Sequence, residues 1–161
     1  MSQAVRAYVA LGSNLGDSLR AVETGFDSLA ALPGCRLVAR SSLYRTAPVG
    51  VGKQPDFINA AAALDTTLGP HDLLAVLLGV EARHGRTRHV PLAARTLDLD
   101  LLLHGNTLLA EPGLQLPHPR MHQRAFVLVP LAEIAPELVI PGLGPIAGLL
   151  PAVADQAIIR L

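Results

Sequence analysis

This chain has a single cysteine, no surplus of positive or negative charge and no long apolar segment, and each absence excludes a class of protein. Cys35 is the only cysteine among 161 residues, so no disulfide can form within the chain, which suits a reducing cytoplasm. No stretch reaches the roughly 18 apolar residues of a membrane span, and residues 1–8 lack the apolar run of a signal peptide. We therefore expect a cytoplasmic protein.

The chain has no excess of either charge and almost no aromatic residues. Basic and acidic residues number 13 each, which argues against a general nucleic-acid binder or a protein held to a membrane surface by charge. Tryptophan is absent and aromatics make up 3%, so the core must consist mainly of Leu, Val, Ile and Ala. The length suits one domain, residues 1–161, and we expect a monomer that binds small molecules.

Alternating apolar residues predict strands and a period of 3.6 predicts helices. The expected strands are residues 4–11, 35–46, 56–67 and 96–104. The first expected helix begins at Asp17 or Ser18 and ends before residues 33–34, and the second begins at Pro70 and ends at Gly85. The order β-α-β-β-α-β predicts an α+β, ferredoxin-like core, with both helices on one face of an antiparallel sheet. A C-terminal extension follows.

Turn residues and apolar spacing also predict the structure of the extension. Gly105 and Asn106 should form a turn into a short return strand at residues 107–109. Two helical segments are expected near residues 121–134 and 146–154, with a kink or break at Pro130.

Asp98 and Asp100 stand two positions apart in the last expected strand. The period of two places both carboxylates on one sheet face and Leu97, Leu99 and Leu101 on the other. Their Cα atoms should lie about 7 Å apart along the strand, which lets the two carboxylates share one metal ion or hold a pair of ions. Carboxylate oxygens suit Mg²⁺, which takes its other ligands from water and nucleotide phosphates. The alternative is a solvent-facing strand whose two aspartates bind nothing.

Arginines gather in the sequence around these aspartates. They are Arg86 and Arg88, Arg95, and Arg120 and Arg124. Fixed positive charge beside paired carboxylates is explained if a polyphosphate lies between them, and phosphoryl transfer depends on such positioning and charge. The alternative is simple pairing, for example of Arg95 with either aspartate.

Other segments offer groups for a planar ligand. Phe57 and Asn59 share one face of their strand, one with a flat ring and the other with a paired donor and acceptor, although a core aromatic and a turn-linked Asn would look the same. The turn at residues 12–17 lacks the pattern of a phosphate loop, so we interpret it as a structural turn. The alternative is a turn whose backbone groups bind a neutral ligand. His118, between two prolines, is a candidate phosphate donor or base.

Taken together, these segments resemble the 6-hydroxymethyl-7,8-dihydropterin pyrophosphokinase family. The matching motifs occur in family order: ALGSNLG (10–16), SLYRT (42–46), QPDFINA (54–60), GRTR (85–88), RTLDLD (95–100), LPHP (116–119) and EIAPE (133–137). The resemblance covers nearly the whole chain. It implies transfer of the terminal diphosphate of ATP to 6-hydroxymethyl-7,8-dihydropterin, with AMP as the other product.

The resemblance also implies a role for each matching residue. Asp98 and Asp100 would hold two Mg²⁺ ions, and Arg86 and Arg95 would neutralise charge during transfer. The residues that would place ATP are Leu74, Leu78, Glu81, Arg86, Arg88, Arg95, Leu101, His118 and Arg124. Those that would line the pterin site are Gly12, Thr46, Val49, Phe57, Asn59 and Phe126.

The chain departs from the family in three places. Many members have Arg-Trp-Gly-Pro before the arginine that matches Arg95, whereas residues 90–94 here read VPLAA, and Ala47 and Pro119 stand where the family often has proline and tyrosine. From the residues alone, two other functions stay open. One is a ferredoxin-like module that binds a small regulatory ligand without chemistry, and the other is a Mg²⁺-dependent nucleotidyl or phosphoryl transferase with a different acceptor.

Overall fold

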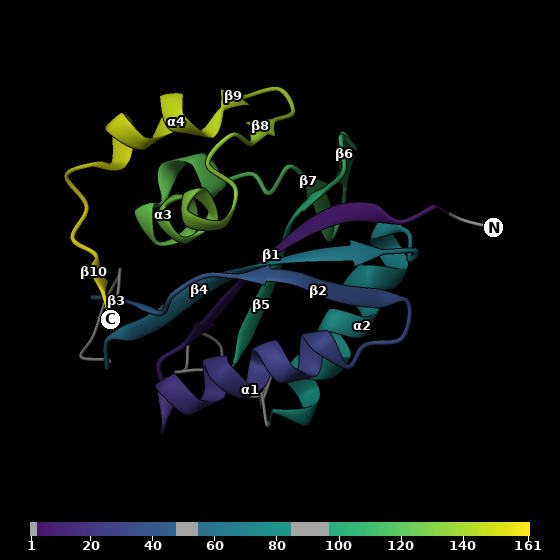
Figure 1. Cartoon of the computed structure of the whole chain (residues 1–161), viewed down its shortest axis with the longest axis horizontal. Coiled ribbons are helices and arrows are strands. Elements are labelled where there is room, and N and C mark those ends of the chain that lie inside the picture. Colours follow the sequence, from purple (N-terminus) through teal and green to yellow (C-terminus); the bar gives the residue numbers. More distant parts are fainter. Residues whose placement is uncertain (1–2, 48–54, 85–96) are drawn as a thin grey trace.

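An antiparallel sheet forms the centre of the computed structural model, which describes residues 3–47, 55–84 and 97–161 (Figure 1). Its strands are β1 (Val5–Ser13), β2 (Cys35–Arg40), β3 (Tyr44–Thr46), β4 (Phe57–Thr66), β5 (Asp98–His104) and β10 (Ile159–Arg160). All neighbouring strands in it are antiparallel. With helices packed on this sheet, the α+β class expected from the sequence is confirmed.

The strand order is β10-β3-β4-β1-β5, and β2 also pairs with β4. The single strand expected at residues 35–46 is wrong in one respect, because it is broken into β2 and β3. At the break, the Ser41 hydroxyl donates to the Ser42 carbonyl at 2.7 Å and accepts from the Ala61 amide at 2.8 Å. A side chain therefore takes the place of part of the backbone ladder. Strand β1 runs two residues further than expected, since both β4 and β5 pair with its end.

Helices α1 (Ser18–Ala30) and α2 (Pro70–Arg83) cover one face of the sheet (Figure 1). Asp17 is the N-cap of α1 and accepts a hydrogen bond from the Arg20 amide at 3.2 Å. Pro70 opens α2, where its missing N–H leaves no helical bond unmade. Phe26 and Leu73 are among the side chains that these helices bury against the sheet. The expected stop of α2 at Gly85 lies outside the described residues.

The C-terminal extension covers the opposite face (Figure 1). It contains η1 (Met121–Gln123), α3 (Ala125–Ile134), α4 (Ile146–Leu149) and η2 (Leu150–Val153). Ala61 and Ala63 of β4 are fully buried beneath it, and their small side chains let α3 approach the sheet closely. Of the kink or break expected at Pro130, the break is wrong: Pro130 lies inside α3, and the interruption falls at Arg124, whose backbone is extended.

Two small hairpins complete the structure. They pair β6 (Leu109–Glu111) with β7 (Leu114–Leu116), and β8 (Val139–Ile140) with β9 (Gly144–Pro145). The turn expected at Gly105 is confirmed and has φ of 56°, but the return strand begins at Leu109 and pairs with β7 rather than with β5. None of the helices in the described part of the chain is both long and apolar enough to cross a bilayer.

Candidate active site

The edge strand β5 presents the two carboxylates. Asp98 and Asp100 lie opposite Gly12 and Ala10 of β1, so their side chains share one face, as the period of two predicts. Leu99, between them, is buried against the α1 and α2 layer. Both aspartates line a larger cavity and a smaller one. The carboxylates therefore stand where two binding spaces meet.

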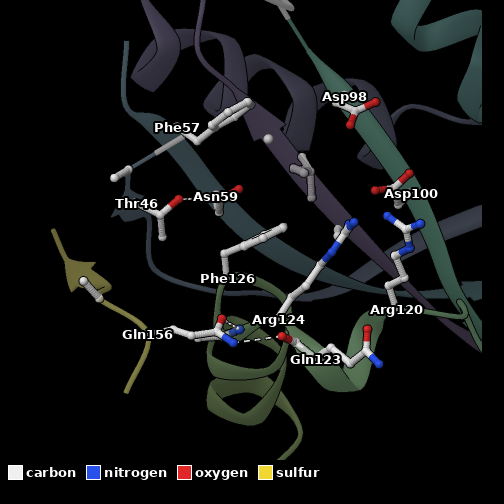
Figure 2. Close-up of a pocket in the computed structure, with 16 residues that line it drawn as sticks. Thr46, Phe57, Asn59, Asp98, Asp100, Arg120, Gln123, Arg124, Phe126 and Gln156 are labelled. Carbon is white, nitrogen blue, oxygen red and sulfur yellow. Dashed lines mark hydrogen bonds between the residues drawn. The ribbon is translucent and has the colours of Figure 1, made fainter. Parts of the chain in front are cut away.

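The larger cavity has a volume of about 880 Å³. It lies between the sheet, the start of α3 and the C-terminal tail (Figure 2). Its lining residues are Ala10, Leu11, Gly12, Thr46, Ala47, Phe57, Asn59, Asp98, Asp100, Arg120, Gln123, Arg124, Ala125, Phe126, Gln156 and Ala157. Phe57 comes from β4 and Phe126 from α3, with Asn59 on the strand wall between them (Figure 2). Two aromatic rings and one amide around a hollow suit a flat, polar-edged ligand.

Asn59 is 4% exposed and is held in one orientation. Its Nδ2 donates to the Thr46 hydroxyl at 2.8 Å, across the pair of strands β3 and β4. Gly12 lies directly opposite Asn59, and a Cβ on Gly12 would approach the Asn59 Oδ1 to 3.3 Å. The missing side chain at Gly12 therefore leaves room for the amide and for a ligand beside it.

Positive charge borders the aspartate side of the larger cavity. Arg120 and Arg124 reach toward Asp100 (Figure 2), and the Arg124 guanidinium lies 5.4 Å from the centre of the Phe126 ring. Burial, together with the charges of Arg124 and Arg120, lowers the pKa of His118, against an opposing effect of Asp98. His118 is therefore neutral at pH 7 and can act as a hydrogen-bonding group rather than as a cation.

The smaller cavity has a volume of about 400 Å³ and opens at the outer edge of β5. Its lining residues are Leu74, Leu78, Glu81, Asp98, Leu99, Asp100, Leu101, Gly113, Leu114, Gln115, His118 and Pro119. Apolar side chains of this lining come from α2 and β5, and its polar groups include the two aspartates and His118. One end thus suits an apolar ring system and the other suits charged groups.

Glu81 joins the helix wall of this cavity to the edge strand. It is 1% exposed, and its Oε2 accepts a hydrogen bond from the Leu99 amide at 2.7 Å. An edge strand has amides that no neighbouring strand satisfies, and here a buried carboxylate satisfies one of them. Glu81 therefore fixes β5, and with it Asp98 and Asp100, to α2.

The site residues predicted from the sequence make up about half of the residues that line the two cavities. The larger cavity contains Gly12, Thr46, Phe57, Asn59, Arg124 and Phe126, and the smaller one contains Leu74, Leu78, Glu81, Leu101 and His118. The missed residues include two whole segments, namely residues 113–115 of the β6–β7 hairpin and Gln156 and Ala157 of the tail. No spacing in the sequence indicates that either segment returns to the site.

Four candidates lie outside the described residues. They are Val49, Arg86, Arg88 and Arg95, and the VPLAA segment at residues 90–94 lies there as well. Ala47 lines the larger cavity and Pro119 the smaller one, so two of the three departures from the family pattern are at the site.

The carboxylate pair fits a magnesium ion. Within the described stretches, no three His, Cys, Asp or Glu side chains come together as a complete ligand set. Mg²⁺ does not need one, because it keeps several waters and is commonly bound by one or two carboxylates plus phosphate oxygens. Asp98 and Asp100, half-buried and facing both cavities, supply this donor set.

Known proteins give an independent comparison. The family model described as 7,8-dihydro-6-hydroxymethylpterin-pyrophosphokinase matches residues 8–136. A 2-amino-4-hydroxy-6-hydroxymethyldihydropteridine pyrophosphokinase of Pseudomonas aeruginosa is 47% identical over 156 residues, which cover 97% of this chain and 96% of that protein. One of the same description from Methylorubrum extorquens is 50% identical over 137 residues, covering 85% and 87%.

Solved structures share the fold. A Plasmodium falciparum HPPK-DHPS variant crystallised with SDX-DHP superposes with a TM-score of 0.77 at 14% sequence identity. The match covers 96% of this chain and 47% of that one, so the chain spans about half the length of that structural relative. At this identity the likeness concerns the fold alone, and it agrees with the ferredoxin-like core and its extension.

Proposed function

The chain belongs to the 7,8-dihydro-6-hydroxymethylpterin-pyrophosphokinase family, and from this premise we propose how its residues divide the reaction. Members transfer diphosphate from ATP to 6-hydroxymethyl-7,8-dihydropterin in folate biosynthesis, and this chain is such an ATP-dependent diphosphokinase. The non-catalytic module and the transferase with another acceptor are therefore set aside. The observation on which our assignment rests is that two cavities meet at Asp98 and Asp100.

We assign the pterin to the larger cavity. A bicyclic pterin has two flat faces and an edge of alternating donors and acceptors, which suit the rings of Phe57 and Phe126 and the amide of Asn59. Thr46 fixes the amide through its 2.8 Å bond, and Gly12 leaves space beside it. Val49 belongs to the same proposed set.

We assign ATP to the smaller cavity. Leu74, Leu78 and Leu101 offer an apolar surface to the adenine, and residues 113–115 of the β6–β7 hairpin line the same cavity. From there the triphosphate would extend toward His118 and the two aspartates, at the border of the larger cavity. The β-phosphorus would then face the hydroxymethyl group of the pterin.

The reaction joins the hydroxymethyl oxygen to the β-phosphorus and breaks the bond from that phosphorus to the oxygen shared with the α-phosphate, leaving AMP. Asp98 and Asp100 would hold Mg²⁺, in our proposal two ions, which neutralise phosphate charge when bound. Arg86 and Arg95 would add fixed charge to the transferred group, and Arg88, Arg124 and Glu81 would help to place the nucleotide. Arg120 and Arg124 line the larger cavity, which the two aspartates also border.

The product of ATP tests this assignment directly. The protein is incubated with ATP, 6-hydroxymethyl-7,8-dihydropterin and Mg²⁺, and the nucleotide products are separated. We expect one AMP for each pterin diphosphate and no ADP, and we expect turnover to stop when EDTA removes the metal. Formation of ADP, or undiminished turnover without a divalent cation, would contradict the proposal.

Two expectations from the sequence stay predictions, namely a monomer and a cytoplasmic location. The single cysteine Cys35 supports the second one. It is half-buried, with its Sγ 3.3 Å from the Thr66 hydroxyl. Size-exclusion chromatography with light scattering measures whether the protein is a monomer.

A further inference from the structure

The C-terminal tail forms one side of the larger cavity, a role that no sequence motif indicates. Gln156 and Ala157 line the cavity, and the chain then continues into β10, which pairs with β3. The tail thus touches both the α3 wall and the β3–β4 wall. Figure 2 shows Gln156 beside the start of α3, across the cavity from the aspartates.

Gln156 makes two hydrogen bonds to the backbone at the start of α3. Its Oε1 accepts from the Ala125 amide at 2.8 Å, and its Nε2 donates to the Gln123 carbonyl at 2.9 Å (Figure 2). The first amides of a helix have no partner within the helix, and the N-cap residue Arg124 supplies no side-chain cap. Gln156 therefore caps α3 from 31 positions further along the chain.

The two bonded groups lie on either side of Arg124, the interruption between η1 and α3. Arg124 and Phe126 flank Ala125, and both of their side chains line the cavity. The Arg124 guanidinium lies over the Phe126 ring, and both side chains project from one short piece of backbone, residues 124–126. The bonds of Gln156 fix this piece of backbone.

The other end of the tail is fixed to the strand wall. Ile159 and Arg160 pair with β3, and the Leu161 amide donates to the Leu43 carbonyl at 2.9 Å. The Arg160 guanidinium also lies 3.6 Å from the Glu133 carboxylate of α3. Strand β3 also contains Thr46, which orients Asn59. A short segment of chain thus connects the wall with Asn59 to the wall with Phe126.

We propose that Gln156 is a positioning residue of the pterin site, which sets Phe126 and Arg124 at a fixed distance from Asn59 and Thr46. It acts through the backbone at Gln123 and Ala125 and need not touch the pterin. The inference rests on the proposed placement of the pterin in the larger cavity. Gln156 and the two residues that it bonds do not line the smaller cavity. The main effect of Gln156 therefore falls on the pterin, and the part of Arg124 in placing ATP leaves only a small effect on the nucleotide.

The experiment compares Gln156→Ala, Gln156→Glu and the control Asp155→Ala, in which a neighbouring exposed side chain is removed. Affinity for a pterin analogue is measured by calorimetry in the presence of Mg²⁺ and a non-hydrolysable ATP analogue, and nucleotide affinity is measured separately. Loss of a helix cap predicts that Gln156→Ala raises the pterin dissociation constant about tenfold, with nucleotide affinity within about twofold of wild type. Hydrogen exchange of the Ala125 amide should become faster.

Gln156→Glu keeps the acceptor for the Ala125 amide and loses the donor to Gln123, so its pterin affinity should fall between those of wild type and Gln156→Ala. It also provides the test if Gln156→Ala fails to fold. The inference is overturned if Gln156→Ala binds pterin like Asp155→Ala, if both ligands weaken equally, or if Gln156→Glu weakens pterin binding as much as Gln156→Ala does. If Asn59→Ala also leaves pterin binding unchanged, the proposed pterin site itself is wrong.

Discussion

Gly12 shows how single residues define the site. It lies on the central strand β1 between Asn59 of β4 and Asp98 of β5, so one residue separates the proposed pterin contact from the proposed metal ligand. A methyl group there would come within 3.3 Å of the Asn59 amide oxygen. A residue without a side chain at this position lets the two functional side chains face one common space.

Asp98→Asn and Asp100→Asn should each lower kcat by roughly a hundredfold or more, because an amide replaces a charged metal ligand. Both side chains are half-buried and border the cavities, so the folded state should survive. Steady-state rates and circular dichroism measure the two effects. Wild-type rates in either variant would contradict the metal assignment, and unfolding of both variants would show a structural role instead.

Asn59→Ala should weaken pterin binding about tenfold, since the buried polar edge of the ligand loses its partner. The affinity for ATP should stay nearly unchanged. Thr46→Val tests the orientation of the amide, because it removes the acceptor of the 2.8 Å bond and keeps the volume. Its effect should be smaller, and the double variant should bind pterin no worse than Asn59→Ala. Additive losses would mean that Thr46 contributes independently of Asn59. The readout is calorimetric titration with the pterin analogue and with the ATP analogue.

At the scale of elements, Glu133 joins three segments that are distant in sequence. Its carboxylate, on α3, accepts hydrogen bonds from the Tyr44 hydroxyl at 2.6 Å and from the Ser42 amide and hydroxyl at 3.0 Å, with Arg160 of β10 3.6 Å away. Burial raises the pKa of Tyr44 to about 12, assisted by the hydrogen bond to Glu133. Burial would also raise the pKa of Glu133, but the bonds from Tyr44 and Ser42 outweigh it and lower that pKa.

The lowered pKa of Glu133 predicts how stability depends on pH. A carboxyl group whose pKa is lower in the folded state stabilises the fold above its unfolded value of 4.5, and this contribution is lost as pH falls through the folded value. Glu133→Gln should therefore lower the free energy of unfolding at pH 7 by less than about 1 kcal/mol, since the group is partly exposed. The difference from wild type should shrink as pH falls below 4.5.

Urea unfolding of both proteins between pH 7 and pH 3 measures this difference. Glu137→Gln, in the exposed turn after α3, is the matched control and should follow wild type over the whole range. A constant difference between Glu133→Gln and wild type at every pH would rule out the charge of Glu133 as the cause.

The helices and strands also show which parts of the fold can be predicted from the sequence. Strand and helix periods predicted β1, α1, β4, α2 and β5, because alternating and 3.6-residue patterns follow from burying one face. The break at residues 41–43 was missed, since it depends on bonds from Ser41 and Glu133 to partners at distant positions. At Pro130, local backbone chemistry predicted a kink or a break, and helix α3 is not broken at this buried residue.

In the site, too, residues on one strand could be predicted from the sequence, whereas residues placed by long-range packing could not. Phe57, Asn59, Asp98 and Asp100 were paired correctly because each pair lies on one strand, where the period of two decides the face. The contributions of Gly113 and Gln156 depend on how the hairpin and the tail fold back onto the sheet. Such long-range packing leaves no periodic pattern in the sequence.

At the scale of the whole molecule, the edge strand separates two ligand spaces. The larger cavity lies on the α3 side of the sheet, and the smaller one lies between the edge of β5, α2 and the β6–β7 hairpin. The aspartates border both. This layout predicts that a change confined to the outer wall of one space affects one substrate, whereas a change at the aspartates affects turnover as a whole.

Leu78→Trp tests this layout, because Leu78 lines only the smaller cavity of the two and is 37% exposed at its rim. An indole there fills part of a space of about 400 Å³, and overpacking of this kind costs about 1–3 kcal/mol. We therefore expect the KM for ATP to rise about tenfold, while the KM for the pterin at saturating ATP stays within about twofold of wild type. Because the chain has no other tryptophan, the new indole also reports nucleotide binding by its fluorescence. Leu108→Trp, at a position that is 67% exposed and lines neither cavity, is the control and should change neither KM nor respond to nucleotide. Equal increases in both KM values in Leu78→Trp would show that the two cavities do not bind the two substrates separately.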